Sequence, residues 1–432
     1  MTNFRNSGVN IRAAGVSRRA VLAWSAAGAA SMKLGVRSAF AQGAEPVKIG
    51  FVFPFSGRLA SYGESAGAGV DLALKMVNEA GGIQSLGGAP MEIFRGDDQG
   101  DPKLASSEIE RLVTQENISG LIGVFSSTEA VSVGSLADQY EIPFVSPSWT
   151  TEKAFTIGST YSRTFNLIGE SFALGGIEML RNLNENEGLN AKKVGLIYDG
   201  SEYGRGVMQI VVKLLAEMDG YSVVADIPYN TPITDFSSYV LRLRDSGAEV
   251  LMSAQYYQET VLLLRAMDSL DYRTPFVGCA SGFSDVRLPG ALGESVAQRA
   301  LSAPVFGPVA VSDLVPYEPL SVFLDRARVE GYVFGAGGLD VNWFALGAQA
   351  VFIYKAAVDA AASREGKDIN AALLAMEMER GSPDLIVPFY DPNLAWDATG
   401  KPRNQSVPYI QWQDGEMRLV FPESLKTAEV RL

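Results

Sequence analysis

Short apolar segments rich in β-branched residues alternate with amphipathic segments of helical period between residues 47 and 270. The apolar segments predict strands at residues 47–53, 91–94, 120–124, 144–146, 193–198, 223–227 and 250–253. The amphipathic segments predict helices at residues 59–79, 103–115, 131–140, 203–218, 236–244 and 260–270. Repeated strand–helix–strand units of this kind predict an α/β protein with parallel sheets that are covered by helices on both faces.

Polar residues gather where three of these strands end, at residues 54–63, 125–128 and 146–150. In such sheets, ligands bind beyond the carboxyl ends of the strands. Hydroxyl groups and the free N–H groups of helix N-termini favour an anion there, so the three clusters together predict a carboxylate-binding site. A local alternative stays open, because Ser126 to Glu129 also has the S-x-x-E spacing of a capping box, which needs no ligand.

The C-terminal part of the chain has a different pattern. Residues 391–404 are rich in Pro, Asp, Asn and Gly and predict a loop, and residues 407–412 and 417–421 predict a final hairpin. Tyr409 and Trp412 are expected to be packing residues of this hairpin. The roughly 390 residues beyond position 41 are too many for one core and suit two lobes.

Residues 1–41 have the composition of an export signal. They contain six basic residues and no acidic residue, and Arg18-Arg19 precedes an Ala-rich run at residues 20–32 and then Ala39-Phe40-Ala41. This order predicts a twin-arginine signal that is cleaved after about Ala41, while an ordinary Sec signal with a chance arginine pair stays open. A membrane anchor is disfavoured because the run is shorter than the roughly 20 residues of a span. The expected location is the periplasm.

The charge balance bears on possible partners. The chain has 36 basic and 49 acidic residues, so loss of six basic residues with the export signal leaves 30 against 49, a net charge of −19. Such a surface repels phosphate groups, which disfavours nucleic acids and anionic membranes as partners. High solubility is the simplest consequence of this charge.

Histidine is absent, and Cys279 is the single cysteine. These counts exclude a zinc site and Cys/His or Ser/His hydrolases, and the sequence has no phosphate-binding loop and no G-x-S-x-G elbow. We therefore expect no catalytic residue, no metal site and no cofactor. One cysteine allows no intrachain disulfide, and Cys279 is expected to be a small core residue.

The order and spacing of several short motifs resemble the type I periplasmic binding proteins, and within them the leucine/isoleucine/valine-binding proteins. The resemblance covers most of the chain after residue 41. It is carried by GFVFPFSG at residues 50–57 with Tyr62-Gly63, NEAGGI at residues 78–83, Asp97-Asp98 with Asp101-Pro102, GVFSS at residues 123–127, and Ile142-Pro143 leading to Ser146-Pro147.

The resemblance implies an α/β fold of two doubly wound Rossmann-like lobes that are joined by a three-crossing hinge. The crossings would fall near Asn166, Ala303 and Val387. Residues 42–165 and 303–386 would then form the first lobe, and residues 166–302 and 387–432 the second.

The resemblance also implies roles for individual residues. Hydroxyl groups of the first lobe would hold a ligand carboxylate, aromatic side chains would line the pocket or close over it, and the second lobe would add closing contacts. The carboxylate group would be held by Ser127, Ser148 and Thr150, the lining and closing residues would be Phe125, Trp149 and Tyr62, and the second-lobe residues would be Tyr203, Tyr256 and Ser281.

The chain departs from the branched-chain amino-acid binders in three places. The turn at residues 280–282 lacks the acidic residue that would pair with a ligand ammonium group; Asp285, Glu202 or Glu259 could substitute, although each is expected to be a solvated charge. Positions 100 and 126, where the disulfide of that family would fall, are not cysteine. Trp149 stands where a small residue is frequent, and a ligand wall and simple packing stay equally open for it.

Three classes of function remain after these considerations. The best supported is a monomeric solute-binding protein that captures an amino acid or related small carboxylate and delivers it to the permease and ATPase subunits of an ABC importer. A ligand-sensing protein of the same fold, such as an amide or amino-acid receptor, is the alternative. A carboxylate-based enzyme comes third, because no paired carboxylates stand out at the predicted cleft.

Overall fold

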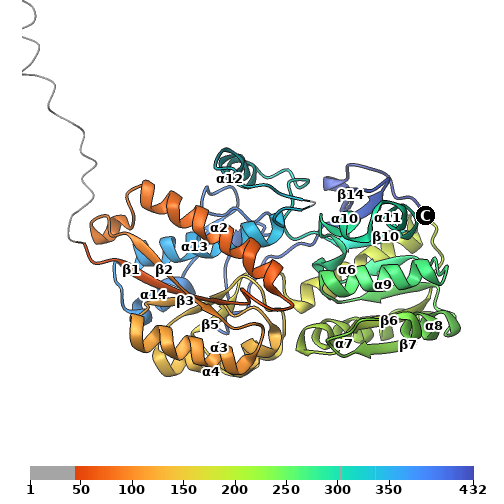
Figure 1. Cartoon of the computed structure of the whole chain (residues 1–432), viewed down its shortest axis with the longest axis horizontal. Coiled ribbons are helices and arrows are strands. Elements are labelled where there is room, and N and C mark those ends of the chain that lie inside the picture. Colours follow the sequence, from red (N-terminus) through yellow and green to blue (C-terminus); the bar gives the residue numbers. More distant parts are fainter. Residues whose placement is uncertain (1–43, 302–303, 336) are drawn as a thin grey trace, which may run out of the picture. The chain divides into compact units, whose positions relative to one another are not determined.

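The computed structural model describes residues 44–301, 304–335 and 337–432, and the predicted export segment lies outside them. Its strands form a five-stranded sheet, a seven-stranded sheet and a two-stranded ribbon (Figure 1). Each strand and helix predicted between residues 47 and 270 is present, with ends that differ by a few residues. We call the five-stranded sheet with its helices the first lobe, and the seven-stranded sheet with its helices the second lobe.

The sheet of the first lobe is parallel throughout and has the order β2-β1-β3-β4-β5. Its strands are β1 (Val47–Phe53), β2 (Met91–Asp97), β3 (Gly120–Ile122), β4 (Phe144–Ser146) and β5 (Ser162–Thr164). Phe51 and Phe53 pack in the same core as α2 (Ala60–Glu79) and α13 (Val341–Ala361), whereas Val52 packs with α3 (Pro102–Arg111) and α4 (Ser127–Tyr140). Alternate strand residues thus face opposite helix layers. Figure 1 shows α2 and α13 on one side of this sheet and α3 and α4 on the other.

Small residues let α2 and α13 approach closely. A Cβ atom added to Gly69 would lie 1.8 Å from the Phe344 carbonyl oxygen, and one added to Gly347 would lie 2.1 Å from the Ala66 carbonyl oxygen. Helix α13 is long and apolar enough to cross a membrane, but 72% of its apolar window is buried inside the protein. It is therefore the central core helix of the first lobe.

The sheet of the second lobe has the order β14-β13-β10-β9-β8-β6-β7, in which β13 runs antiparallel to both its neighbours. Its strands are β6 (Lys193–Asp199), β7 (Ser222–Tyr229), β8 (Val250–Ser253), β9 (Phe276–Gly278), β10 (Val305–Pro308), β13 (Tyr409–Gln413) and β14 (Glu416–Phe421). Leu196 packs in the same core as α6 (Gly169–Glu185) and α7 (Glu202–Ala216), and Ile197 packs in the core of α8 (Ser237–Asp245) and α9 (Tyr257–Ser269). Helices therefore cover both faces of this sheet too.

The remaining elements are short or lie beside these layers. They are η1 (Gln84–Leu86), η2 (Leu112–Glu116), α5 (Lys153–Thr156), η3 (Ser281–Phe283), α10 (Leu288–Leu292), α11 (Glu294–Ala300), α12 (Glu318–Val329), α14 (Gly366–Leu374), β11 (Met378–Glu379), β12 (Asn393–Leu394) and η4 (Glu423–Leu425). The predicted loop at 391–404 contains β12, which pairs with β11. The predicted hairpin is β13 and β14, and Tyr409, Trp412 and Cys279 are all buried.

The pairing of strand β10 and the contacts of the segment after β11 indicate which parts of the chain link the two lobes. Strand β10, which the expected boundary at residue 303 gives to the first lobe, pairs with β9 and β13 of the second. Tyr390 Oη donates to the Phe165 carbonyl oxygen, and Trp396 Nε1 donates to that of Thr164, so this segment lies against the end of β5. We propose that the links between the lobes are residues 165–168, 309–317 and 395–408.

Candidate functional site

A cavity lies between the strand ends of the two lobes. Its lining residues are Tyr62, Phe125, Ser127, Ser148, Trp149, Thr150, Asn166, Phe172, Tyr203, Gln255, Tyr256, Gly282 and Trp343. The cavity volume is about 30 Å³, which is room for one or two water molecules. A ligand of amino-acid size therefore enters only when the lobes separate or the aromatic side chains move.

The N-terminus of α4 forms one wall of the cavity. Its capping box is present, since Glu129 N donates to Ser126 Oγ at 3.1 Å and Ser126 N donates to Glu129 Oε2 at 2.7 Å. The prediction that Ser126 and Glu129 form a capping box is thus confirmed. Ser127, the residue after Ser126, lines the cavity, so the capping box lies directly beside the candidate ligand site.

Hydroxyl groups from two strand ends meet at this wall. Thr150 N donates to Ser127 Oγ at 3.2 Å, and Ser148 N donates to Ser146 Oγ at 3.0 Å. The Thr150 side chain lines the cavity and is 4% exposed, and its Oγ1 is buried without a hydrogen-bond partner. A buried hydroxyl group without a partner carries a free-energy cost, so Thr150 Oγ1 offers an unused donor to a ligand.

Aromatic rings from both lobes form the other walls. The Tyr62 ring lies 5.2 Å from the rings of Phe125 and Trp343, and 5.9 Å from the ring of Tyr256. The Tyr203 and Tyr256 rings lie 4.7 Å apart. Trp149 combines the two roles left open for it, because it lines the cavity and also packs against Phe155 at 5.1 Å.

The second lobe contributes polar groups as well as rings. Gln255, two residues beyond β8, is fully buried; its Oε1 accepts from Ser253 Oγ at 3.0 Å and its Nε2 donates to Thr260 Oγ1 at 3.1 Å. Ser281 begins η3, but its side chain lies outside the described residues. A Cβ atom on Gly282 would lie 2.4 Å from the Gln255 carbonyl oxygen, so no side chain fits at that position.

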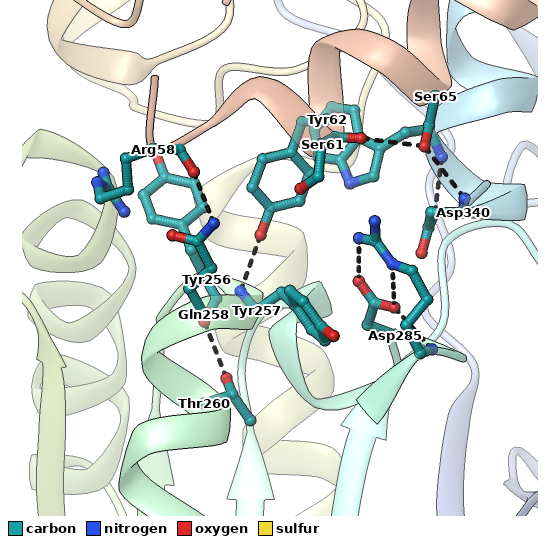
Figure 2. A network of polar contacts seen from close by, with 12 residues as sticks. Arg58, Ser61, Tyr62, Ser65, Tyr256, Tyr257, Gln258, Thr260, Asp285 and Asp340 are labelled. Carbon is teal, nitrogen blue, oxygen red and sulfur yellow. Dashed lines mark hydrogen bonds and ion pairs between the residues drawn. The ribbon is translucent and has the colours of Figure 1, made fainter. Parts of the chain in front are cut away.

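Three contacts tie the first lobe to the start of α9, as Figure 2 shows in part. Tyr257 N donates to Tyr62 Oη at 2.8 Å, and Gln258 Nε2 donates to the Arg58 carbonyl oxygen at 2.7 Å. Arg58 Nη1 also pairs with Glu259 Oε1 at 2.8 Å. These contacts hold the lobes together at the mouth of the cavity.

The expectation that the nearby acids are solvated charges is wrong for two of them. Asp285 is 4% exposed and pairs with Arg287 at 2.6 Å, and Glu259 is 2% exposed and pairs with Arg58. Burial raises the pKa of Glu259, and the arginine opposes that shift. Glu202 pairs with Lys153 at the surface. None of the three acids lines the cavity.

Four lining residues were not among those expected from the sequence: Asn166, Phe172, Gln255 and Trp343. The strand-end rule could have found Gln255, since it lies two residues beyond β8. Trp343 lies in the first turn of α13 and carries no local signal. Within residues 44–301, 304–335 and 337–432, no group of three or more Cys, Asp or Glu side chains is placed to hold a metal ion.

Comparisons with known proteins agree with this architecture. A family model described as periplasmic binding protein matches residues 46–416. Leu/Ile/Val-binding protein homolog 7 of Brucella suis biovar 1 (strain 1330) is 27% identical over 392 residues, which are 89% of this chain and 94% of that protein.

Two solved structures share the fold. The branched-chain amino acid transporter substrate binding protein of Streptococcus pneumoniae, in complex with isoleucine, has a TM-score of 0.70 at 23% identity, over 88% of this chain and 100% of the other. An ABC transporter solute binding protein of Rhodopseudomonas palustris HaA2, in complex with p-hydroxybenzoic acid, has a TM-score of 0.70 at 17% identity. This match covers 86% of this chain and 95% of the other. The chain therefore belongs to the periplasmic binding protein family, and within it to the type I proteins of branched-chain amino acid transporter type.

Proposed function

We propose that this chain is the solute-binding protein of an ABC importer and that it captures a small carboxylate, such as an amino acid or a related acid, between its lobes. The observation that carries the proposal is the buried, unpartnered Thr150 Oγ1, which lines the cavity beside Ser127 at the N-terminus of α4. A helix N-terminus with unpaired donors favours an anion. Ser148 would complete the set of hydroxyl groups around the ligand carboxylate.

The relatives support this class of function. The Brucella relative is named a Leu/Ile/Val-binding protein homolog, and the two solved structures are named as substrate- or solute-binding proteins of transporters. The ligands named for these structures, isoleucine and p-hydroxybenzoic acid, both carry a carboxyl group. Such relatives favour capture of a solute over catalysis. We further infer that residues 1–41 direct export to the periplasm.

Closure of the lobes would couple binding to transport. Tyr62, Arg58 and Gln258 join the two lobes beside the cavity, and these contacts would break if the lobes moved apart. A ligand that contacts both lobes favours this closed arrangement by its differential affinity for it. Permease and ATPase subunits of an importer would then recognise the closed surface.

The ligand can be found by thermal-shift measurements with a panel of amino acids, aromatic acids, hydroxy acids and amides. A compound at 100 times its dissociation constant stabilises the folded state by about 2.7 kcal/mol. For the best compound, uptake of its labelled form by cells should be lost when the gene is deleted. Retained uptake with a lost transcriptional response would instead favour the sensing alternative.

Thr150→Val should weaken binding of the best carboxylate about 10- to 150-fold, because a hydrogen bond to a charged group contributes about 1.5–3 kcal/mol. Calorimetric titration measures this change. Thr156→Val, on the exposed end of α5, is the matched control and should leave the affinity unchanged. An unchanged affinity in Thr150→Val would place the carboxylate elsewhere.

A further inference from the structure

The cavity is uncharged on all sides. None of the described side chains that line it is an Asp, Glu, Lys or Arg, and more than half of the lining residues are aromatic. A carboxylate needs only hydrogen-bond donors, which Ser127, Thr150 and α4 supply. The ammonium group of an α-amino acid needs acceptors as well, and a buried cation without them carries a large penalty.

The two amide side chains of the cavity are hydrogen-bonded at both ends. Asn166 Oδ1 accepts from Leu167 N at 2.8 Å and its Nδ2 donates to the Ser148 carbonyl oxygen at 2.9 Å. Gln255 Oε1 accepts from Ser253 Oγ at 3.0 Å and its Nε2 donates to Thr260 Oγ1 at 3.1 Å, so each amide group has one N–H left to offer a ligand and an oxygen that already accepts one hydrogen bond. A free N–H group suits a ligand carboxylate, and it cannot accept a hydrogen bond from a ligand ammonium group.

The acids near the cavity do not line it. Asp285 is held by Arg287, and Glu259 pairs with Arg58 through Oε1 while its Oε2 is buried without a hydrogen-bond partner. Asp199 is buried and accepts from Ser201 N at 2.8 Å. Asp199 does not line the cavity; its carboxylate, after burial, raises the pKa of Tyr203, which does.

Two aromatic walls face each other from the two lobes. Tyr62 and Phe125 of the first lobe lie within 5.9 Å of Tyr256 of the second, between ring centroids. A planar ring inserted between such walls gains face and edge contacts that an aliphatic chain does not.

Resting on the proposed function, we infer that the site selects a small aromatic carboxylate without an amino group over the corresponding α-amino acid. Phe125, Tyr62 and Tyr256 contact the ring of such a ligand, and Ser127 and Thr150 hold its carboxylate. The cavity lining offers no carboxylate to pair with a ligand ammonium group.

Matched ligand pairs test this inference on the unmodified protein without its export segment. We expect 3-phenylpropionate to bind at least 10-fold more tightly than phenylalanine, and 4-methylpentanoate more tightly than leucine, because each pair differs only in the α-amino group. Benzoate should bind at least 3-fold more tightly than cyclohexanecarboxylate, which differs in aromaticity. Calorimetric titration gives all six affinities.

Each other outcome is informative. Tighter binding of phenylalanine or leucine than of its deaminated partner overturns the inference but leaves the proposed function standing. Tighter binding of glycine betaine than of benzoate also overturns it, since aromatic rings can receive a methylated ammonium group. If no carboxylate binds at all, the proposed function itself fails.

Gln255→Glu provides a second test, because it places a carboxylate on the cavity wall with little change of shape. We expect 3-phenylpropionate to bind at least 10-fold more weakly to this variant, and the preference over phenylalanine to shrink or reverse. Gln209→Glu, exposed on α7, adds the same charge away from the cavity and should change neither affinity. An unchanged preference in Gln255→Glu would contradict the inference.

Discussion

Tyr62 shows how one side chain serves both lobes. Its ring packs against Phe125 inside the first lobe, and its hydroxyl oxygen accepts a hydrogen bond from Tyr257 N at the start of α9. The first N–H groups of a helix have no partner within the helix. In the closed arrangement Tyr62 therefore supplies the hydrogen-bond acceptor for Tyr257 N, a role that water would take when the lobes are apart.

Tyr62→Phe keeps the ring and removes this acceptor. We expect the affinity for the ligand to fall about 5-fold, because one neutral hydrogen bond contributes about 1 kcal/mol to closure. The free energy of unfolding should change less, since the freed N–H group can be solvated when the lobes separate. Titration calorimetry and urea unfolding measure the two quantities. Tyr239→Phe, on α8, is the control, and equal affinities for both variants would argue against a closing role of Tyr62.

At the scale of elements, the close pair of helices α2 and α13 determines how well the first lobe holds its shape. Gly69 and Gly347 permit this approach, because either Cβ atom would collide with a backbone carbonyl oxygen of the other helix. The N-terminus of α13 carries Trp343, and the first turn of α2 carries Tyr62, so the same pair positions two walls of the cavity.

Gly347→Ala should destabilise the protein by about 1–3 kcal/mol or more, because an inserted methyl group forces the helices apart. Gly206→Ala is a matched control that should change the free energy of unfolding in the opposite direction. The nearest atom to its Cβ is Thr151 Oγ1 at 3.7 Å, so alanine should stabilise the interior of α7 by up to about 1 kcal/mol. Urea unfolding measures both changes. Equal effects of the two substitutions would mean that the α2–α13 contact can relax.

For the molecule as a whole, stability should depend on pH through buried carboxyl groups. Asp98 and Glu129 are both fully buried, and one oxygen of each carboxyl group, Asp98 Oδ2 and Glu129 Oε1, has no hydrogen-bond donor within the described residues. Burial, followed by the charge of Glu129, raises the pKa of Asp98 to about 8. Burial also raises the pKa of Glu129, to about 6.

These pKa values are raised on folding, so the folded state holds protons that the unfolded state releases near pH 4. The free energy of unfolding should therefore fall as the pH rises from about 4 to about 8, by about 1 kcal/mol per pH unit where one extra proton is held. Asp98→Asn removes the carboxyl group with the higher pKa and should flatten this dependence. Asp219→Asn, which is exposed, should not. An unchanged slope in Asp98→Asn would assign the dependence to other groups.

The sequence by itself determined the features that depend on neighbouring residues. The alternation of apolar and amphipathic segments predicted the strands and helices from β1 to α9, and the spacing of Ser126 and Glu129 predicted their capping box. The strand-end rule pointed to the clusters that contain Tyr62, Ser127 and Thr150, which the fold brings to one cavity. Periodicity and capping act over a few residues, so they can be recognised without knowing the fold.

Only the tertiary structure decided which distant groups meet. Glu259 was expected to be solvated, but it is buried and pairs with the partly exposed Arg58, 201 residues earlier in the chain. Trp343 reaches the cavity because α13 packs against α2. No local sequence pattern predicts this contact. The placement of β10 in the second sheet likewise depends on its partners β9 and β13. The free energy of a buried charge or ring depends on the atoms around it, and those are set by packing between segments far apart in the chain.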